Sequence, residues 1–275
     1  MNISGTTRVV VHLAYPARHL RTPTFFNPLL QQLGHDAVLV PWQVQPSELA
    51  RVWEGLRQVE NLAGVIVTIP HKEAVAQLCH DLSGAAEQLQ VCNVARRNAD
   101  GTFSGQFFDG EGFVLGLRNQ GHHLAGRNAL LLGAGGAATG IAQALLAAGV
   151  STLGIHNRTE ARAHSRVNQL RALFPQREIQ VADANGQGYD LVVNATSLGL
   201  KSDDPLPVDP ETLVPGTLVG EVVMNPDVTP LLQAAQNRGC VIHKGSHMIV
   251  GQLSLIADFL FGKPPIGKGR GDTLR

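Results

Sequence analysis

The stretch that decides the fold reads Leu130-Leu131-Leu132-Gly133-Ala134-Gly135-Gly136-Ala137-Ala138 and continues into small residues up to about Ala148. The leucines predict a buried strand, and the small residues predict a helix that begins directly after the glycines. The stretch fits the pattern G-x-G-x-x-(G/A), with Gly133, Gly135 and Ala138 in the three special positions. Gly133 permits the turn, Gly135 lets the backbone approach a pyrophosphate, and Ala138 lets the helix lie close to the strand. Because a helix N-terminus offers free N–H groups and positive dipole to phosphates, we predict a dinucleotide-binding unit of Rossmann type.

The residues after the next expected strand indicate which dinucleotide binds. That strand covers residues 152–156, and Asn157-Arg158-Thr159 follows it, with Arg162 one helical turn further on. An NAD-binding unit usually has an acidic residue here, which accepts hydrogen bonds from the ribose 2′-hydroxyl, whereas guanidinium groups and a hydroxyl suit a 2′-phosphate. We therefore predict NADP(H) and keep NAD(H) as the alternative. In a simpler interpretation the two arginines only cover a solvated helix start, with Glu160 neutralising part of their field.

Composition excludes several classes of protein. The chain has 275 residues, enough for two modest α/β domains, and its 22 basic and 22 acidic residues balance. No basic block is present, which argues against a nucleic-acid partner. The start has no signal-peptide form, no apolar run reaches transmembrane length, and the three cysteines show no metal or redox spacing. We expect a cytoplasmic protein, a monomer or homodimer, with a small-molecule substrate, no membrane partner and no metal.

Strand and helix patterns alternate along the chain, so the sequence predicts an α/β fold with mainly parallel sheets. In the N-terminal half, strands are expected over 8–13, 37–41 and 63–69, helices over 24–33, 46–58 and 70–78, and a hairpin over 93–105. In the C-terminal half, strands are expected near 129–132, 151–156, 178–182, 190–194, 217–222 and 240–243, and a last helix over 247–259.

A series of short motifs resembles the shikimate dehydrogenase family, in that family's order and over nearly the whole chain. The motifs are Val67-Thr68-Ile69-Pro70-His71-Lys72-Glu73, Val91-Cys92-Asn93, Asp109-Gly110-Glu111-Gly112, the glycine stretch, Asn157-Arg158-Thr159, Asn194-Ala195-Thr196-Ser197-Leu198-Gly199, Thr229-Pro230-Leu231-Leu232 and Gly251-Gln252. The resemblance implies a substrate domain over 1–108 plus 247–262, a Rossmann-type NADP domain over 109–246 and a cleft between them. It also implies reversible hydride transfer between nicotinamide and the 3-hydroxyl carbon of a cyclic hydroxy acid. The Gly, Pro and Lys content of the last residues separately predicts a flexible tail over 263–275.

The same resemblance implies roles for individual residues. Lys72 and Asp109 fall on the family's catalytic lysine and aspartate, and the implied substrate contacts are Thr22, Thr68, Asn93 and Gln252. The implied cofactor contacts are Gly133, Ala134, Gly135, Gly136, Ala137, Asn157, Arg158, Thr159, Arg162, Asn194 and Thr196. Oxidising an alcohol requires a base for the hydroxyl proton, and a helix start, where the dipole disfavours a positive charge, suits a lysine in that role. In the simpler interpretation Lys72 is an exposed helix lysine and Asp109 is a turn residue before Gly110.

Departures from the family cluster where the substrate carboxylate would bind. The family's segment H-S-x-S-P corresponds to His19-Leu20-Arg21-Thr22-Pro23, so that Leu20 replaces one serine. Ile66 stands at an asparagine position and Met224 at a tyrosine position. Each lost hydrogen bond to a buried carboxylate would cost about 1–3 kcal/mol.

Further apolar residues stand near the same site: Val94 occupies a common threonine position, and Phe107 and Phe108 replace polar residues before Asp109. Two interpretations remain open. Either Arg18, His19 or Arg21 supplies a charge-assisted contact to the carboxylate, or the substrate is a different, less polar hydroxy-cyclohexene or related acid.

We therefore expect an NADP-dependent dehydrogenase of shikimate or a close analogue. One alternative is an NAD-dependent dehydrogenase of quinate or another cyclic hydroxy acid. The other is a non-catalytic dinucleotide-sensing protein. Retention of both Lys72 and Asp109 argues against the sensor, since a sensor needs no acid/base pair.

Overall fold

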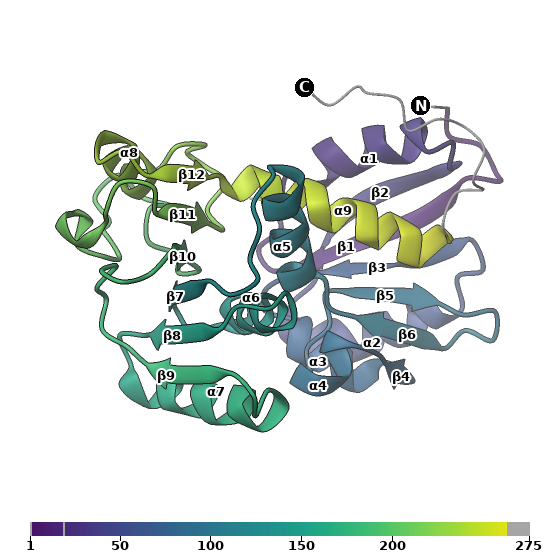
Figure 1. Ribbon diagram of the computed structural model, residues 1–275. Coiled ribbons are helices and arrows are strands. Elements are labelled where there is room, and N and C mark those ends of the chain that lie inside the picture. Colours follow the sequence, from purple (N-terminus) through teal and green to yellow (C-terminus); the bar gives the residue numbers. More distant parts are fainter. Residues whose placement is uncertain (1, 19, 263–275) are drawn as a thin grey trace. The chain divides into compact units, whose positions relative to one another are not determined.

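The computed structural model describes residues 2–18 and 20–262, which form two units (Figure 1). Unit 1 contains the described residues within Met1–Leu82, Val94–Gly105 and Leu253–Arg275, and unit 2 contains Ser83–Asn93 and Gln106–Gln252. Residues 83–93, 106–108 and 247–252 thus group with the second unit. His19 and the predicted tail over 263–275 lie outside the described residues.

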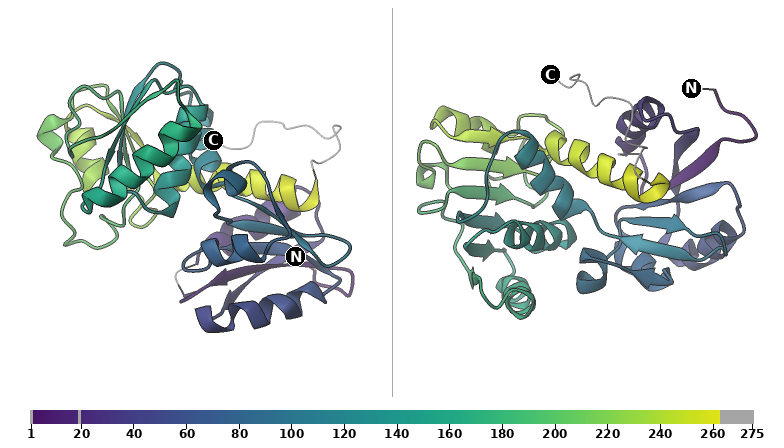
Figure 2. Two further views of the ribbon diagram at one scale, coloured as in Figure 1. Left: turned by 90° about the horizontal axis from the view of Figure 1, so that it is seen from below. Right: turned by 45° about the vertical axis from the view of Figure 1, so that its right-hand side comes forward.

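Unit 1 is built on a mixed six-stranded sheet in the order β2-β1-β3-β5-β6-β4, shown with its helices in Figure 2. β1 pairs in parallel with β2 and β3, whereas β3 pairs antiparallel with β5. Every residue of β3 is buried, as an uninterrupted apolar strand predicts. The strands are β1 (Arg8–Ala14), β2 (Ala37–Gln43), β3 (Leu62–Val67), β4 (Asp81–Leu82), β5 (Val94–Arg97) and β6 (Phe103–Gln106), and the helices are α1 (Thr22–Gln32), η1 (Pro46–Glu48), α2 (Leu49–Arg57) and α3 (Lys72–Leu78).

Unit 2 is built on a parallel six-stranded sheet in the order β12-β11-β10-β7-β8-β9. This is the strand order of a Rossmann fold, and it reverses between β7 and β10, where such folds bind dinucleotides. The strands are β7 (Asn128–Leu132), β8 (Thr152–His156), β9 (Glu178–Val181), β10 (Leu191–Asn194), β11 (Leu218–Glu221) and β12 (Val241–His243). The helices are α4 (Ala85–Leu89), α5 (Asp109–Asn119), α6 (Gly136–Ala147), α7 (Glu160–Leu173), η2 (Pro210–Thr212) and α8 (Pro230–Asn237).

Helix α9 (Gly245–Phe261) contributes residues to both units, with the division between Gln252 and Leu253. In unit 1 its last residue, Phe261, stacks on the His35 ring with centroids 4.6 Å apart, and the Arg8 guanidinium lies 5.2 Å from the Phe261 ring centre. These contacts fix the end of the helix on the first sheet. Among the described residues, no helix has the length and apolar character needed to cross a membrane.

Helix α5 is an element that the sequence analysis did not predict, and the turn interpretation of Asp109 was wrong because Asp109 is its first residue. Because glycine is unfavourable in helices, Gly110, Gly112 and Gly116 made this segment look non-helical in the sequence. Packing explains them: a Cβ on Gly110 would lie 1.9 Å from the Gly140 carbonyl oxygen of α6. The glycines therefore let α5 lie against α6 and the first part of α9. Helix α3 also begins at Lys72, two residues after the predicted start at Pro70.

Candidate active site and cofactor site

The structure brings three of the predicted site residues of unit 2 together at Asp109. Its side chain is 4% exposed, and one carboxylate oxygen, Oδ1, accepts hydrogen bonds from Asn93 Nδ2 at 2.7 Å and from Gln252 Nε2 at 2.5 Å. Asn93 Oδ1 in turn accepts from the backbone N–H of Phe108 at 2.9 Å. The carboxylate is therefore held in one orientation by two amides at the first residue of α5.

Local packing explains how Gln252 reaches Asp109. A Cβ on Gly112 would lie 2.6 Å from the Cβ of Gln252, and one on Gly251 would lie 2.5 Å from the Gly112 carbonyl oxygen. The absence of side chains at both glycines allows the two helix backbones to approach. Asn93 is fixed independently, because its backbone N–H donates to the Gln106 carbonyl at 3.0 Å.

The remaining predicted substrate and catalytic residues belong to unit 1. Lys72 is half-buried and begins α3, after His71, whose Nε2 lies 2.9 Å from the Val44 carbonyl oxygen. Burial lowers the pKa of His71, so that a neutral ring donates this hydrogen bond at neutral pH. Thr68 follows β3, with its backbone N–H bonded to the Leu13 carbonyl at 3.0 Å, and Thr22 is the half-buried first residue of α1. The predicted position of Lys72 in the first turn of a helix is confirmed.

The residues that differ from the family pattern lie in different environments. Ile66 is 5% exposed within β3 and Leu20 is half-buried, while Arg18 and Arg21 are exposed. Phe107 is buried, and a Cβ on Gly140 would lie 2.6 Å from its ring, so this phenylalanine is a packing residue. Of the alternative carboxylate ligands, His19 lies outside the described residues.

The glycine stretch forms the turn that the sequence predicted. Gly133 has a φ of +115°, which favours glycine, and its N–H donates to the His156 carbonyl at 2.8 Å. A Cβ there would also lie 3.0 Å from the Ala195 carbonyl oxygen. Gly135 precedes α6, and a Cβ on Gly135 or Gly136 would meet no atom within 4 Å. An open helix N-terminus next to this turn fits the pyrophosphate of a dinucleotide.

The end of β8 fits a 2′-phosphate. Arg158, Thr159 and Arg162 are exposed, and neither arginine forms an ion pair with a residue that the structure describes. Glu160 does not neutralise them by direct contact: its carboxylate lies 3.4 Å from His164, on the same helix. Asn157 Nδ2 donates to the Thr159 carbonyl at 2.9 Å and fixes the turn before α7. Both guanidinium groups remain accessible to an anion.

Asn194 and Thr196 form the third part of the predicted cofactor site, at the end of β10. Their side chains bond to each other at 2.7 Å, and Asn194 also bonds to Glu221 at 3.1 Å. Sequence reasoning missed Glu221, although an acidic residue at the end of an otherwise apolar strand is a detectable signal.

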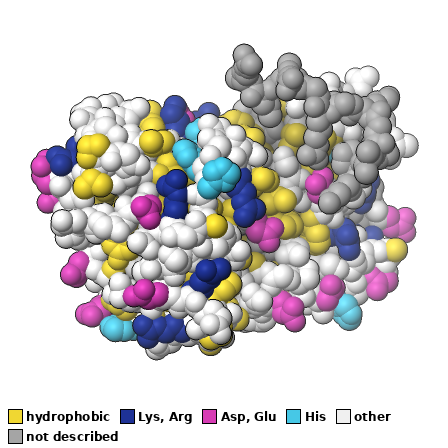
Figure 3. Space-filling view, viewed as in Figure 1, with side chains coloured by type: hydrophobic (Ala, Val, Ile, Leu, Met, Phe, Trp, Pro, Cys, Tyr) yellow, Lys and Arg dark blue, Asp and Glu magenta, His cyan; other side chains and the backbone are white. Residues whose placement is uncertain are grey.

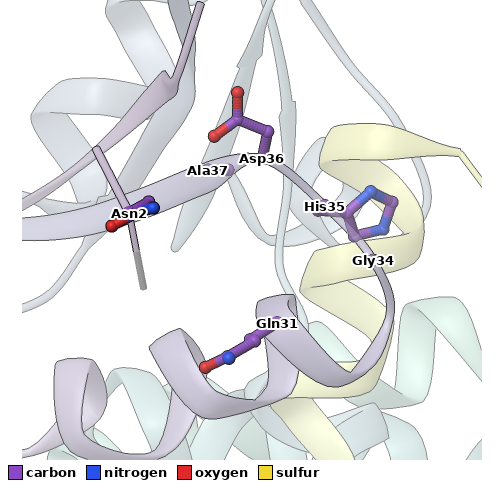
Figure 4. A pocket seen from close by; sticks show the side chains of 6 residues that line it. All are labelled: Asn2, Gln31, Gly34, His35, Asp36 and Ala37. Atoms are coloured by element: carbon purple, nitrogen blue, oxygen red, sulfur yellow. The ribbon is translucent and has the colours of Figure 1, made fainter. Parts of the chain in front are cut away.

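Two surface features lie apart from these residues. A hollow of about 280 Å³ in unit 1 is lined by Asn2, Gln31, Gly34, His35, Asp36 and Ala37 (Figure 4). It contains none of the predicted site residues. On the face drawn in Figure 3, basic and acidic side chains are interspersed and form no extended basic patch, in agreement with the balanced composition.

A Rossmann sheet with an open glycine turn, two accessible arginines and a buried carboxylate held by amides defines a dinucleotide-dependent oxidoreductase. Two family descriptions match the chain: "Shikimate dehydrogenase substrate binding domain" over residues 13–95 and "Shikimate / quinate 5-dehydrogenase" over residues 116–200. The shikimate dehydrogenase (NADP(+)) of Rubrobacter xylanophilus is 40% identical over 255 residues, which cover 91% of this chain and 89% of the relative. The chain belongs to the shikimate dehydrogenase family.

Solved structures agree with this assignment. Shikimate 5-dehydrogenase from Listeria monocytogenes, in complex with shikimate and NAD, has a TM-score of 0.88 and 30% identity, and the match covers 96% of this chain and 95% of the other. The ligand-free 5-ketofructose reductase of a Gluconobacter strain has a TM-score of 0.86 and 28% identity, covering 94% of both chains. The predicted family, fold and enzyme class are thus confirmed, and the name of the Rubrobacter relative carries the predicted cofactor, NADP.

Proposed function

We propose that this chain catalyses reversible, NADP-dependent hydride transfer at the 3-hydroxyl carbon of shikimate or a close analogue. Family membership supports the reaction, and the open turn at Gly133 together with the exposed Arg158 and Arg162 supports the cofactor. The observation that carries the assignment is the Asp109 carboxylate, which two amides hold in one orientation while the family's lysine is retained as Lys72.

In the proposed mechanism Lys72 Nζ accepts the proton of the substrate hydroxyl during oxidation and returns it during ketone reduction. NADP⁺, when bound, supplies the hydride acceptor. Asp109 binds the substrate and orients the lysine amine. Because Asn93 and Gln252 already hold Oδ1, the carboxylate does not need to reorganise during the reaction. Thr22, Thr68, Asn93 and Gln252 complete the proposed substrate contacts.

A second candidate function is the reduction of a polyhydroxy ketone that has no carboxylate. Leu20 and Ile66 are apolar where the family resemblance implies hydrogen-bond donors for an acid. The structurally similar Gluconobacter enzyme is named a 5-ketofructose reductase. Such a substrate would keep the Lys72 and Asp109 chemistry and would not require the lost serine hydroxyl and asparagine amide.

The test uses purified protein and follows the formation or consumption of reduced nicotinamide through its absorbance at about 340 nm. Shikimate and quinate are crossed with NADP⁺ and NAD⁺, and 5-ketofructose is supplied with NADPH and NADH. Lys72→Ala should abolish turnover, while Gln77→Ala, an exposed change on the same helix, should leave it unchanged. Turnover of shikimate with NADP⁺ supports the first function, and turnover of 5-ketofructose alone supports the second. Cofactor binding without turnover of any substrate would contradict both.

Leu20→Ser tests the specificity argument directly. If the carboxylate site has been weakened by the loss of a hydroxyl, this variant should lower the KM for shikimate. An unchanged KM would show that another group, such as Arg18 or Arg21, already binds the acid.

A further inference from the structure

Glu221 is a buried carboxylate to which the sequence motifs assign no role. It ends β11, is 0% exposed, and pairs in register with Asn194 of β10. Its Oε1 accepts from Asn194 Nδ2 at 3.1 Å, whereas Oε2 forms no hydrogen bond with any residue that the structure describes. Burial raises the pKa of Glu221, and the Thr229 hydroxyl and Asn194 amide partly oppose this shift. Burying a carboxyl group costs free energy unless it is hydrogen-bonded or paired with an opposite charge.

The bond from Asn194 connects Glu221 to the centre of a hydrogen-bonded loop, residues 194–199. Asn194 Nδ2 also donates to the Leu198 carbonyl at 3.0 Å, and Asn194 Oδ1 accepts from both the backbone N–H and the hydroxyl of Thr196, at 3.1 and 2.7 Å. The Thr196 hydroxyl in turn accepts from the Leu198 N–H at 3.0 Å. The full capacity of the Asn194 side-chain amide is therefore used, and its bond to Glu221 is the one made outside the loop.

This loop forms one wall of the glycine turn. A Cβ on Gly133 would lie 3.0 Å from the Ala195 carbonyl oxygen and 3.2 Å from the Thr196 side chain. The Ala195 N–H donates to the Leu132 carbonyl at 2.9 Å, so the loop is also tied to the strand that enters the turn. A shift of residues 195–196 would therefore change the shape of the turn where the sheet order reverses.

We propose that Glu221 is a positioning residue for the dinucleotide site, which acts by holding the Asn194 amide and, through it, residues 194–199 against Gly133. The inference rests on the NADP binding in the proposed function, and it requires no particular substrate. An acceptor is needed at this position because an apolar side chain would leave the Asn194 N–H without its partner in a fully buried place.

The test measures NADPH affinity without substrate, from nicotinamide fluorescence, in four proteins. Glu221→Ala removes the acceptor, and Glu221→Gln keeps a carbonyl oxygen that can accept from Asn194. Val219→Ala is the matched control, because Val219 is 0% exposed on the same strand and this change lowers stability without removing a hydrogen bond. Thermal unfolding of each protein measures the stability loss separately.

We expect Glu221→Ala to raise the Kd for NADPH about ten-fold, and Glu221→Gln and Val219→Ala to stay within about two-fold of the wild type. Equal weakening by Glu221→Ala and Val219→Ala at similar stability would overturn the proposal, since the effect would then be general destabilisation. Wild-type affinity in Glu221→Ala would also overturn it. A failure of the proposed reaction is distinguishable, because the wild type would bind NADPH and turn over no substrate. A wild type that binds neither NADPH nor NADH would overturn both.

Discussion

Stability should fall steeply below neutral pH because of one buried histidine, His243. Its ring is 0% exposed at the end of β12, its Nε2 forms no hydrogen bond with a described residue, and it packs edge-on against Phe113 at 5.4 Å between ring centres. Burial lowers the pKa of His243 from 6.5 to about 3, and the nearby His247 and His122 add to this shift. The folded protein therefore keeps this ring neutral at pH values where the unfolded chain binds a proton.

The sign and size of the effect follow from linkage. Because the pKa of the folded state lies below that of the unfolded state, the unfolded chain gains a proton first as the pH falls below 6.5. The free energy of unfolding then decreases until the pH approaches the folded value. At about 1.4 kcal/mol per pH unit, lowering the pH from 7 to 5 should remove about 2 kcal/mol through this residue alone.

The assay compares the wild type with His243→Gln by urea unfolding at pH values of about 5, 6, 7 and 8. Circular dichroism monitors the unfolding. Other histidines titrate in both proteins, so the difference between the two stability profiles reports His243 together with His247, whose Nδ1 lies 3.2 Å from His243 Nδ1. The stability difference should shift by about 2 kcal/mol in favour of the variant between pH 7 and 5. His123→Gln, an exposed neighbouring position, is the control and should follow the wild type. A wild-type-minus-variant difference that does not change with pH would refute the argument.

Three further predictions concern packing and the cofactor. Gly112→Ala should lower stability by about 1–3 kcal/mol and reduce kcat, because the added Cβ would lie 2.6 Å from the Cβ of Gln252. Thermal unfolding measures the stability and steady-state kinetics measure kcat. A wild-type kcat would contradict the proposed role of the contact with Gln252. Gly55→Ala should raise stability by about 0.5–1 kcal/mol, because Gly55 lies within α2 and its Cβ would meet no atom within 4 Å; an unchanged unfolding midpoint would count against this. Arg158→Ala combined with Arg162→Ala should raise the KM for NADP⁺ about ten-fold and leave that for NAD⁺ unchanged, whereas equal changes for both cofactors would exclude recognition of the 2′-phosphate.

The sequence predicted all six strands of the Rossmann sheet and the helix after its glycine turn. Its strands were expected near 129–132 and 190–194, and the structure has β7 over Asn128–Leu132 and β10 over Leu191–Asn194. These strands can be predicted from the sequence because each is a short apolar run, buried on both faces and bounded by turn residues. The glycine turn can also be predicted, because the backbone at position 133 has a positive φ that few residues other than glycine adopt.

Helix α5 could not be predicted in the same way, because its glycines serve contacts that only the folded chain makes. Gly110 approaches α6 and Gly112 approaches α9, and neither partner is near in sequence. Local propensity therefore indicated a turn where tertiary packing selects a helix. The pairing of Asp109 with Gln252, separated by 143 positions, was accessible from the sequence only through the family resemblance.

The same distinction explains why the cofactor is easier to assign than the substrate. The pyrophosphate is recognised by backbone N–H groups and by the shape of a turn, so its site imposes glycines and a strand-turn-helix pattern that survive wide sequence change. Substrate selection depends on a few side-chain hydrogen bonds, so we expect a change such as serine to Leu20 to alter it without disturbing α1. One lost bond of about 1–3 kcal/mol is a factor of about 5 to 150 in affinity, yet it leaves the fold intact. Measured activity on an acid and on a neutral ketone must therefore decide the substrate, while the structure already accounts for the orientation of Asp109 that either reaction would use.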